Sequence, residues 1–134
     1  MKELNGLKTT GIVKAIGLST HSVTVVREAS RLKELDVLMT ICCKAEQAIV
    51  NEFREHIPLE DGYIEEMFNA IKLAHSERKG VVAMKVLGSS APPLVRNYQS
   101  SIKSIAQLDF VHAMVIGMRN LDEVEKNAKA IPSC

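Results

Sequence analysis

Four short apolar runs recur along the chain, and each is followed by a stretch whose apolar residues lie at helical spacing. The runs start at Ile12, Val37, Val81 and Val111, which are 25, 44 and 30 residues apart. Such runs are typical of strands buried in a sheet, and a helix between two of them is typical of a crossover between parallel strands. The pattern therefore predicts an α/β fold with an open parallel sheet of four βα units and helices on its outer side.

The boundaries of these units follow from turn residues and helical periodicity. We expect one domain over residues 1–134, with a possible helix remnant in 1–10 that Gly11 closes. The units are expected at about 11–34, 35–80, 81–109 and 110–131, with strands at 12–18, 37–43, 81–87 and 111–116, a loop at 88–93 and a less clear short helix at 45–56. The expected buried helix faces are Val23, Val26, Ala29 and Leu32; Ile64, Met67, Phe68, Ile71 and Ala74; Tyr98, Ile102 and Ile105; and Leu121, Val124, Ala128 and Ile131.

The last unit carries the sharpest local signal. Gly117 ends its apolar run, and Asn120 is expected to cap the following helix, with Glu123 three residues later as in a capping box. A strand, a glycine turn and a helix N-terminus together suit an anion such as a phosphate, and Arg119 in the turn can add a bidentate contact. The alternative is an ordinary strand-to-helix turn with a solvated arginine.

Composition excludes several classes of function. The formal net charge is +1 with both signs interspersed, so nucleic acid and acidic membranes are not expected partners. Cys42, Cys43 and Cys134 have neither a disulfide framework nor a zinc spacing, and buried small side chains are the expected role of the first two. No apolar run approaches the roughly 20 residues of a membrane span, and no signal peptide is visible. We therefore expect a soluble, cytoplasmic protein without a bound metal.

A family resemblance spreads over nearly the whole chain and is carried by four segments. They read VKAIGLSTHS at 13–22, LDVLM at 35–39, GVVAMKVLG at 80–88 and VIGMRNLDEVEKNAKAI at 115–131. These segments resemble barrel units five to eight, the C-terminal half, of the aldo/keto reductases. The likeness is strongest to bacterial and archaeal members, some of which carry an iron–sulfur segment after the barrel. The resemblance implies half of a (β/α)8 TIM barrel from an NADP(H)-dependent oxidoreductase.

The resemblance also implies residues at the nicotinamide end of a cofactor site. Ser19 matches a serine that binds the carboxamide, while Thr20 stands where many members have asparagine and Met39 where a glutamine is usual. The segment under the nicotinamide and pyrophosphate corresponds to Met84, Lys85, Val86 and Leu87. For Lys85 the alternative is a strand lysine that extends to the rim.

The adenosine end is implied by the last unit. Gly117 and Arg119 match the loop that holds the adenosine phosphate, and Glu123 and Asn127 match a pair that contacts the adenine. Asn127 is the most telling, because asparagine has no propensity advantage inside a helix. A phosphate site after the last two strands also agrees with barrel enzymes in general.

The family's catalytic aspartate, tyrosine, lysine and histidine come from the N-terminal half, which the resemblance does not include. Tyr63 and Tyr98 are the only tyrosines and fall in predicted helices, and His21 at a strand end is more typical of a cap or surface residue. We therefore expect this chain alone to be inactive, and cofactor binding to be weak or absent. The alternative is a non-catalytic dinucleotide-binding module or a purely structural half-barrel.

Assembly is the last expectation. A complete barrel needs eight strands, so four leave its centre and both sheet edges open. We expect an apolar interface that forms a homodimer or larger homo-oligomer, or that receives the missing N-terminal half-barrel.

Overall fold

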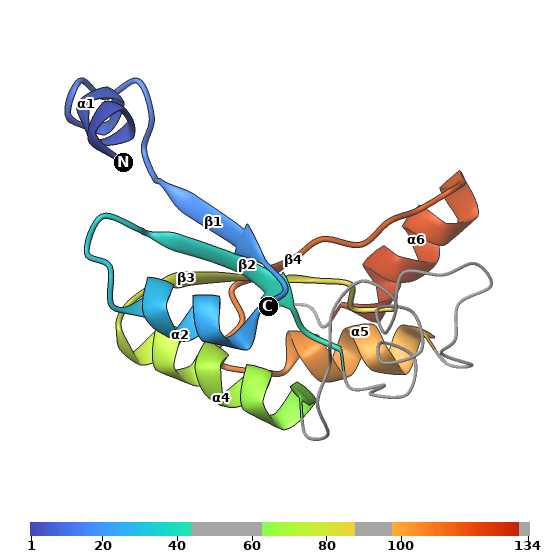
Figure 1. The fold of residues 1–134 in the computed structure, drawn as a ribbon. Helices are drawn as coiled ribbons and strands as arrows, with labels where there is room; N and C mark the ends of the chain where they lie inside the picture. The colour runs from blue at the N-terminus through green and yellow to red at the C-terminus, as the bar shows by residue number, and fades with distance from the viewer. Residues whose placement is uncertain (44–62, 88–97, 132–134) are drawn as a thin grey trace.

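The computed structural model describes residues 1–43, 63–87 and 98–131. Its four strands form one sheet in the order β1-β2-β3-β4, and every neighbouring pair is parallel. This arrangement confirms the predicted α/β fold with a parallel sheet. Figure 1 shows α2, α4 and α5 on one side of the sheet, with α1 and α6 standing at opposite ends. The elements are α1 Lys2–Thr9, β1 Gly17–Thr20, α2 Val23–Ser30, β2 Val37–Ile41, α4 Tyr63–Ser76, β3 Gly80–Met84, α5 Tyr98–Ala106, β4 Ala113–Met114 and α6 Leu121–Ala130.

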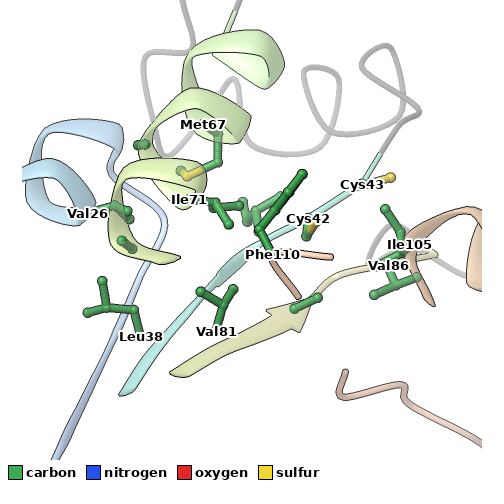
Figure 2. Close-up of a cluster of buried hydrophobic side chains, with 14 of the residues drawn as sticks. Val26, Leu38, Cys42, Cys43, Met67, Ile71, Val81, Val86, Ile105 and Phe110 are labelled. Atoms are coloured by element: carbon green, nitrogen blue, oxygen red, sulfur yellow. The ribbon is translucent and has the colours of Figure 1, made fainter. Parts of the chain in front are cut away.

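The core lies between the sheet and the helices on its covered side (Figure 2). Leu38 on β2 and Val81 on β3 are paired in register and are almost fully buried. Their neighbours Val37 and Met39 are only half-buried, because successive side chains of a strand point to opposite faces. The sheet therefore has one covered face and one face that the helices leave open.

The first strand is shorter and later than residues 12–18. Gly11 closes α1 as predicted, with φ +76°, and the N–H groups of Ile12 and Val13 both bond to the Leu7 carbonyl, at 3.0 and 3.3 Å. These bonds use the backbone groups that a strand would need, and Ile12 is 71% exposed. Strand pairing begins only at Gly17, which lies opposite Val37.

The fourth strand is also shorter than the predicted residues 111–116. Only Ala113 and Met114 pair with β3, and Val115 is 52% exposed. The expectation of a buried strand is wrong here, because Ala113 is exposed and Met114 is only half-buried where the helices leave one face of the sheet open.

Helix periodicity is confirmed in the middle of the chain. Val26 and Ala29 of α2, Met67 and Ile71 of α4, and Ile102 of α5 are all buried. Two predictions of burial are wrong. Leu32 lies beyond the end of α2 and is 48% exposed, and the apolar face of α6 is uncovered, with Leu121 72% exposed.

The chain turns between the predicted helices and strands, but some of the turns lie at other residues than predicted. Gly80, expected to end the second unit, is the first residue of β3, and the left-handed residue after α4 is Arg78, with φ 60°. Cys42 and Cys43 were expected within the strand and lie just past β2, while the burial of both side chains is as expected. The predicted helix at 45–56 and loop at 88–93 lie outside the described residues. In the described part of the chain, no helix is long and apolar enough to cross a membrane.

Candidate functional site

Three of the predicted site residues meet on the open face of the sheet. Ser19 lies opposite Met39 in the register of β1 and β2. The Ser19 hydroxyl also reaches across β2 to within 3.8 Å of the Met84 sulfur on β3. The carboxyl end of the open face thus carries a small polar group in contact with one thioether and opposite a second methionine.

Thr20 is placed differently from Ser19. It lies opposite Thr40, which is fully buried on the helix-covered side. Its Oγ1 accepts a hydrogen bond from the N–H of Ser22 at 3.1 Å, in the turn where Ser22 caps α2. The structure therefore uses the Thr20 side chain to shape the turn after β1.

In the segment after β3, Val86 and Leu87 belong to the hydrophobic core, whereas Lys85 lies at the candidate site. Val86 is 1% exposed and belongs to the core, and Leu87 packs against it. Lys85 has φ +58°, a left-handed conformation that costs energy for a residue with a Cβ. Burial lowers the pKa of His21, and the positive charge of Lys85 lowers it further. A lysine ammonium and a histidine biased toward its neutral form thus share the carboxyl edge of the sheet.

The turn before α6 has the predicted cap. The Glu123 N–H donates to Asn120 Oδ1 at 2.9 Å, which confirms Asn120 as the N-cap. The reciprocal bond differs from a capping box, since the Glu123 carboxylate accepts from the N–H of Arg119 at 2.8 Å rather than from Asn120. Gly117 is exposed, with open space where a Cβ would stand.

Arg119 is engaged by the same carboxylate. Its Nε and Nη2 lie 3.1 and 2.8 Å from Glu123 Oε1. The hydrogen bonds from Arg119 lower the pKa of Glu123, so the carboxylate is held in its charged form. The spacing of four residues, which is common for helical ion pairs, was the signal in the sequence for this contact.

Asn127 is the buried residue of α6. It is 5% exposed, and no hydrogen-bond partner for its Oδ1 is found within the described residues. A buried acceptor without a donor is rare in native proteins and often marks a site for a ligand or water. Figure 1 shows the strand arrows running toward the side of the molecule where α6 lies.

Tyr63, His75 and His112 lie outside this arrangement or already have hydrogen-bond partners. Tyr63 donates its hydroxyl to the backbone carbonyl of His21, and burial raises the pKa of Tyr63 to about 12. His75 and His112 stack with ring centroids 5.3 Å apart, and His112 Nδ1 accepts from the N–H of Val81 at the start of β3. Among the described residues, no group of three or more potential metal ligands occurs.

Comparison with known proteins gives a fold but no sequence relative. No family model matches the chain, and no curated protein matches it. Among solved structures it is similar to a protein from Pseudomonas aeruginosa described as "the putative aldo-keto reductase", with a TM-score of 0.64, 22% sequence identity and 96% of this chain covered. The match covers 43% of that protein's chain, so this chain corresponds to less than half of it. The fold is thus an aldo/keto-reductase-like partial TIM barrel.

Proposed function

We propose that this chain is the C-terminal, cofactor-binding half of an aldo/keto reductase-like oxidoreductase that uses NADP(H). The observation that supports this most is Asn127, whose buried Oδ1 lacks a donor in the described structure. An adenine presents an exocyclic amine, which is the kind of donor that this oxygen requires. The proposal explains why a helix keeps a buried polar side chain at a cost in stability.

The nicotinamide end of the cofactor would lie on the open face of the sheet. Ser19 offers a hydroxyl to a carboxamide, and Met39 and Met84 offer an apolar floor for a planar ring. Met39 cannot donate a hydrogen bond, which is consistent with weak binding. When bound, the cofactor would supply a hydride for carbonyl reduction.

Under this proposal the chain binds the cofactor but does not itself catalyse carbonyl reduction. Tyr63 is buried and its hydroxyl is already donated, so it does not offer a general acid. His21 and Lys85 lie near each other at the carboxyl edge of the sheet, and the hydroxyl of Tyr63 is used by the His21 backbone carbonyl. We expect no carbonyl-dependent oxidation of the reduced cofactor by the chain alone.

A second function is favoured by the ion pair at α6. If Arg119 remains bound to Glu123, its guanidinium is not available to a phosphate, and the chain is a structural half-barrel or a weak dinucleotide-binding module. This alternative predicts that NADPH binds no better than NADH, or that neither binds.

Asn127→Ala tests the proposal because its effects on stability and on affinity have opposite signs. Removal of a buried unpaired acceptor should raise the free energy of unfolding by roughly 1 kcal/mol. Titration of NADPH, followed by its fluorescence, should show weaker binding. Asn69→Ala, at an exposed position inside α4, is the matched control and should leave the affinity unchanged. Equal NADPH affinity in the native protein and Asn127→Ala would refute the assignment.

A further inference from the structure

Asn5 and Gly6 form a pair whose chemistry the candidate site does not use. It is the only Asn-Gly pair in the sequence, and it lies inside α1. In a flexible chain, the backbone nitrogen of the residue after an asparagine can attack the side-chain amide. Glycine allows this attack most readily, because it has no Cβ and its backbone is less restricted than that of other residues.

The reaction is a deamidation that consumes only water. The Gly6 nitrogen forms a bond to Cγ of Asn5 and loses its proton to a solvent base, while the side-chain nitrogen leaves as ammonia. Water then opens the five-membered succinimide at either of its two carbonyls. The product is an aspartate or an isoaspartate at position 5.

A helix opposes this attack. Inside an α-helix each N–H is bonded to the carbonyl four residues earlier, which holds the Gly6 nitrogen away from the Asn5 side chain. Deamidation therefore requires α1 to open. Gly6 also weakens the helix, because glycine loses more conformational freedom on folding than any other residue.

Few contacts hold α1 to the rest of the described structure. None of its residues is buried, and Figure 1 shows it set apart from the helices that cover the sheet. Asn5 and Lys8 are its half-buried residues, and the others are exposed. Lys8 Nζ lies 2.6 Å from both carboxylate oxygens of Asp36, which directly precedes β2. Segments with few buried contacts open locally at a low cost in free energy, so this ion pair is the main restraint on α1 within the described residues.

We propose that Asn5 is a deamidation site protected by the ion pair between Lys8 and Asp36. While the pair is closed, α1 stays helical and the Gly6 nitrogen is withheld from the Asn5 amide. An isoaspartate adds one carbon atom to the backbone. Helical bonds across it, such as the one from the N–H of Thr9 to the Asn5 carbonyl, then lose their register. The modification thus makes a transient opening of α1 permanent.

Peptide mapping of the full chain by mass spectrometry, after incubation at mildly alkaline pH, tests the proposal. Aspartate and isoaspartate should accumulate at Asn5, more slowly than in the same chain unfolded in urea. Lys8→Met should raise the ratio of the folded to the unfolded rate by roughly two- to fivefold, the effect of losing one partly exposed ion pair. Asp36→Asn should do the same, and it keeps an oxygen that can accept from the N–H of Ile16. Lys2→Met, at an exposed position of the same helix, is the control and should leave the ratio unchanged.

Gly6→Ala tests the chemistry of the step. A Cβ at Gly6 would meet open space in the described structure, so the substitution is compatible with α1. It should slow deamidation of Asn5 in both the folded and the unfolded chain. Deamidation at the native rate in this variant would contradict attack by the nitrogen of residue 6.

Three further results would overturn the proposal. Equal rates in the folded and the urea-unfolded native chain would mean that α1 gives Asn5 no protection. A folded chain that stays unmodified while the unfolded chain is converted would mean that α1 does not open. Unchanged rate ratios in both Lys8→Met and Asp36→Asn would show that other contacts hold the helix. No step of the test contains a dinucleotide, so its outcome does not depend on the proposed cofactor site.

Discussion

Arg119 is held by Glu123 through three hydrogen bonds, two from its guanidinium and one from its backbone N–H, at 2.8–3.1 Å. The proposed phosphate ligand is therefore already paired with an anion. A dinucleotide phosphate has to compete with this carboxylate or share the guanidinium with it. The Arg119–Glu123 ion pair therefore weakens phosphate binding at the proposed adenosine end of the site.

Substitutions of Arg119 and Glu123 should change the affinity for NADPH in opposite directions. Arg119→Ala should weaken NADPH binding by about 1.5–3 kcal/mol, the value of a hydrogen bond to a charged group, and should affect NADH less. Glu123→Gln should strengthen NADPH binding, because it frees Arg119. Isothermal titration at constant salt measures both. Glu125→Gln, at an exposed position on the same helix, makes the same change in charge and should have little effect. Equal NADPH affinity in all four proteins would contradict the role of Arg119.

Asp36 predicts a defined response to acid. The hydrogen bond from Lys8, at 2.6 Å, and the one from the N–H of Ile16, at 2.8 Å, lower the pKa of Asp36. A carboxyl whose folded pKa is lowered stabilises the protein above its unfolded pKa of about 4, and the contribution disappears as pH falls through the folded value. Asp36→Asn should therefore be less stable at pH 7, and the difference from the native protein should shrink as the pH falls below about 4 and through the lowered folded pKa.

Urea unfolding between pH 2 and 7 at one protein concentration measures this difference. Asp109→Asn, at an exposed position before β4, is the control. A stability difference for Asp36→Asn that does not change with pH would show that Asp36 contributes through packing rather than charge.

Arg78 predicts a stabilising substitution. It has φ 60°, its N–H bonds to the His75 carbonyl at 2.9 Å, and the N–H of Lys79 bonds to Ala74 at 2.9 Å, which is the pattern of a Schellman motif. Glycine takes this left-handed position without the penalty of a Cβ, so Arg78→Gly should gain about 1 kcal/mol.

Thermal unfolding at a fixed protein concentration should show this gain as a Tm a few degrees higher. Glu77→Gly, one residue earlier and without a positive φ, should lower the Tm. A lower Tm for Arg78→Gly would indicate that the arginine side chain contributes more than its backbone strain costs.

Tyr63 predicts a structural rather than a catalytic effect. Tyr63→Phe removes the hydroxyl that donates to the His21 carbonyl and should cost about 1 kcal/mol of stability. Ultraviolet titration should show one of the two tyrosines of the native protein ionising near pH 12, and the variant should lose that step. NADPH affinity should not change. A large loss of affinity with unchanged stability would assign Tyr63 to the site.

The sequence by itself predicted the elements whose signals are local. Four apolar runs separated by helical stretches required a parallel sheet, because strands that alternate with crossover helices pair in that way. Asn120 could be identified as a cap and Gly11 as a helix end, since both depend on the chemistry of a few neighbouring residues. The same holds for the buried faces of α2, α4 and α5, which need only a neighbouring layer to pack on.

Only the tertiary structure decided where the strands stop and which apolar faces are buried. Ile12 and Leu121 look like core residues by periodicity, but they are 71% and 72% exposed because no element of the described structure packs over them. The meeting of Ser19 with Met84 and the closure of Arg119 on Glu123 were likewise set in three dimensions. Hydrophobic periodicity identifies which face of a helix or strand is apolar, but it does not say which other element packs against that face.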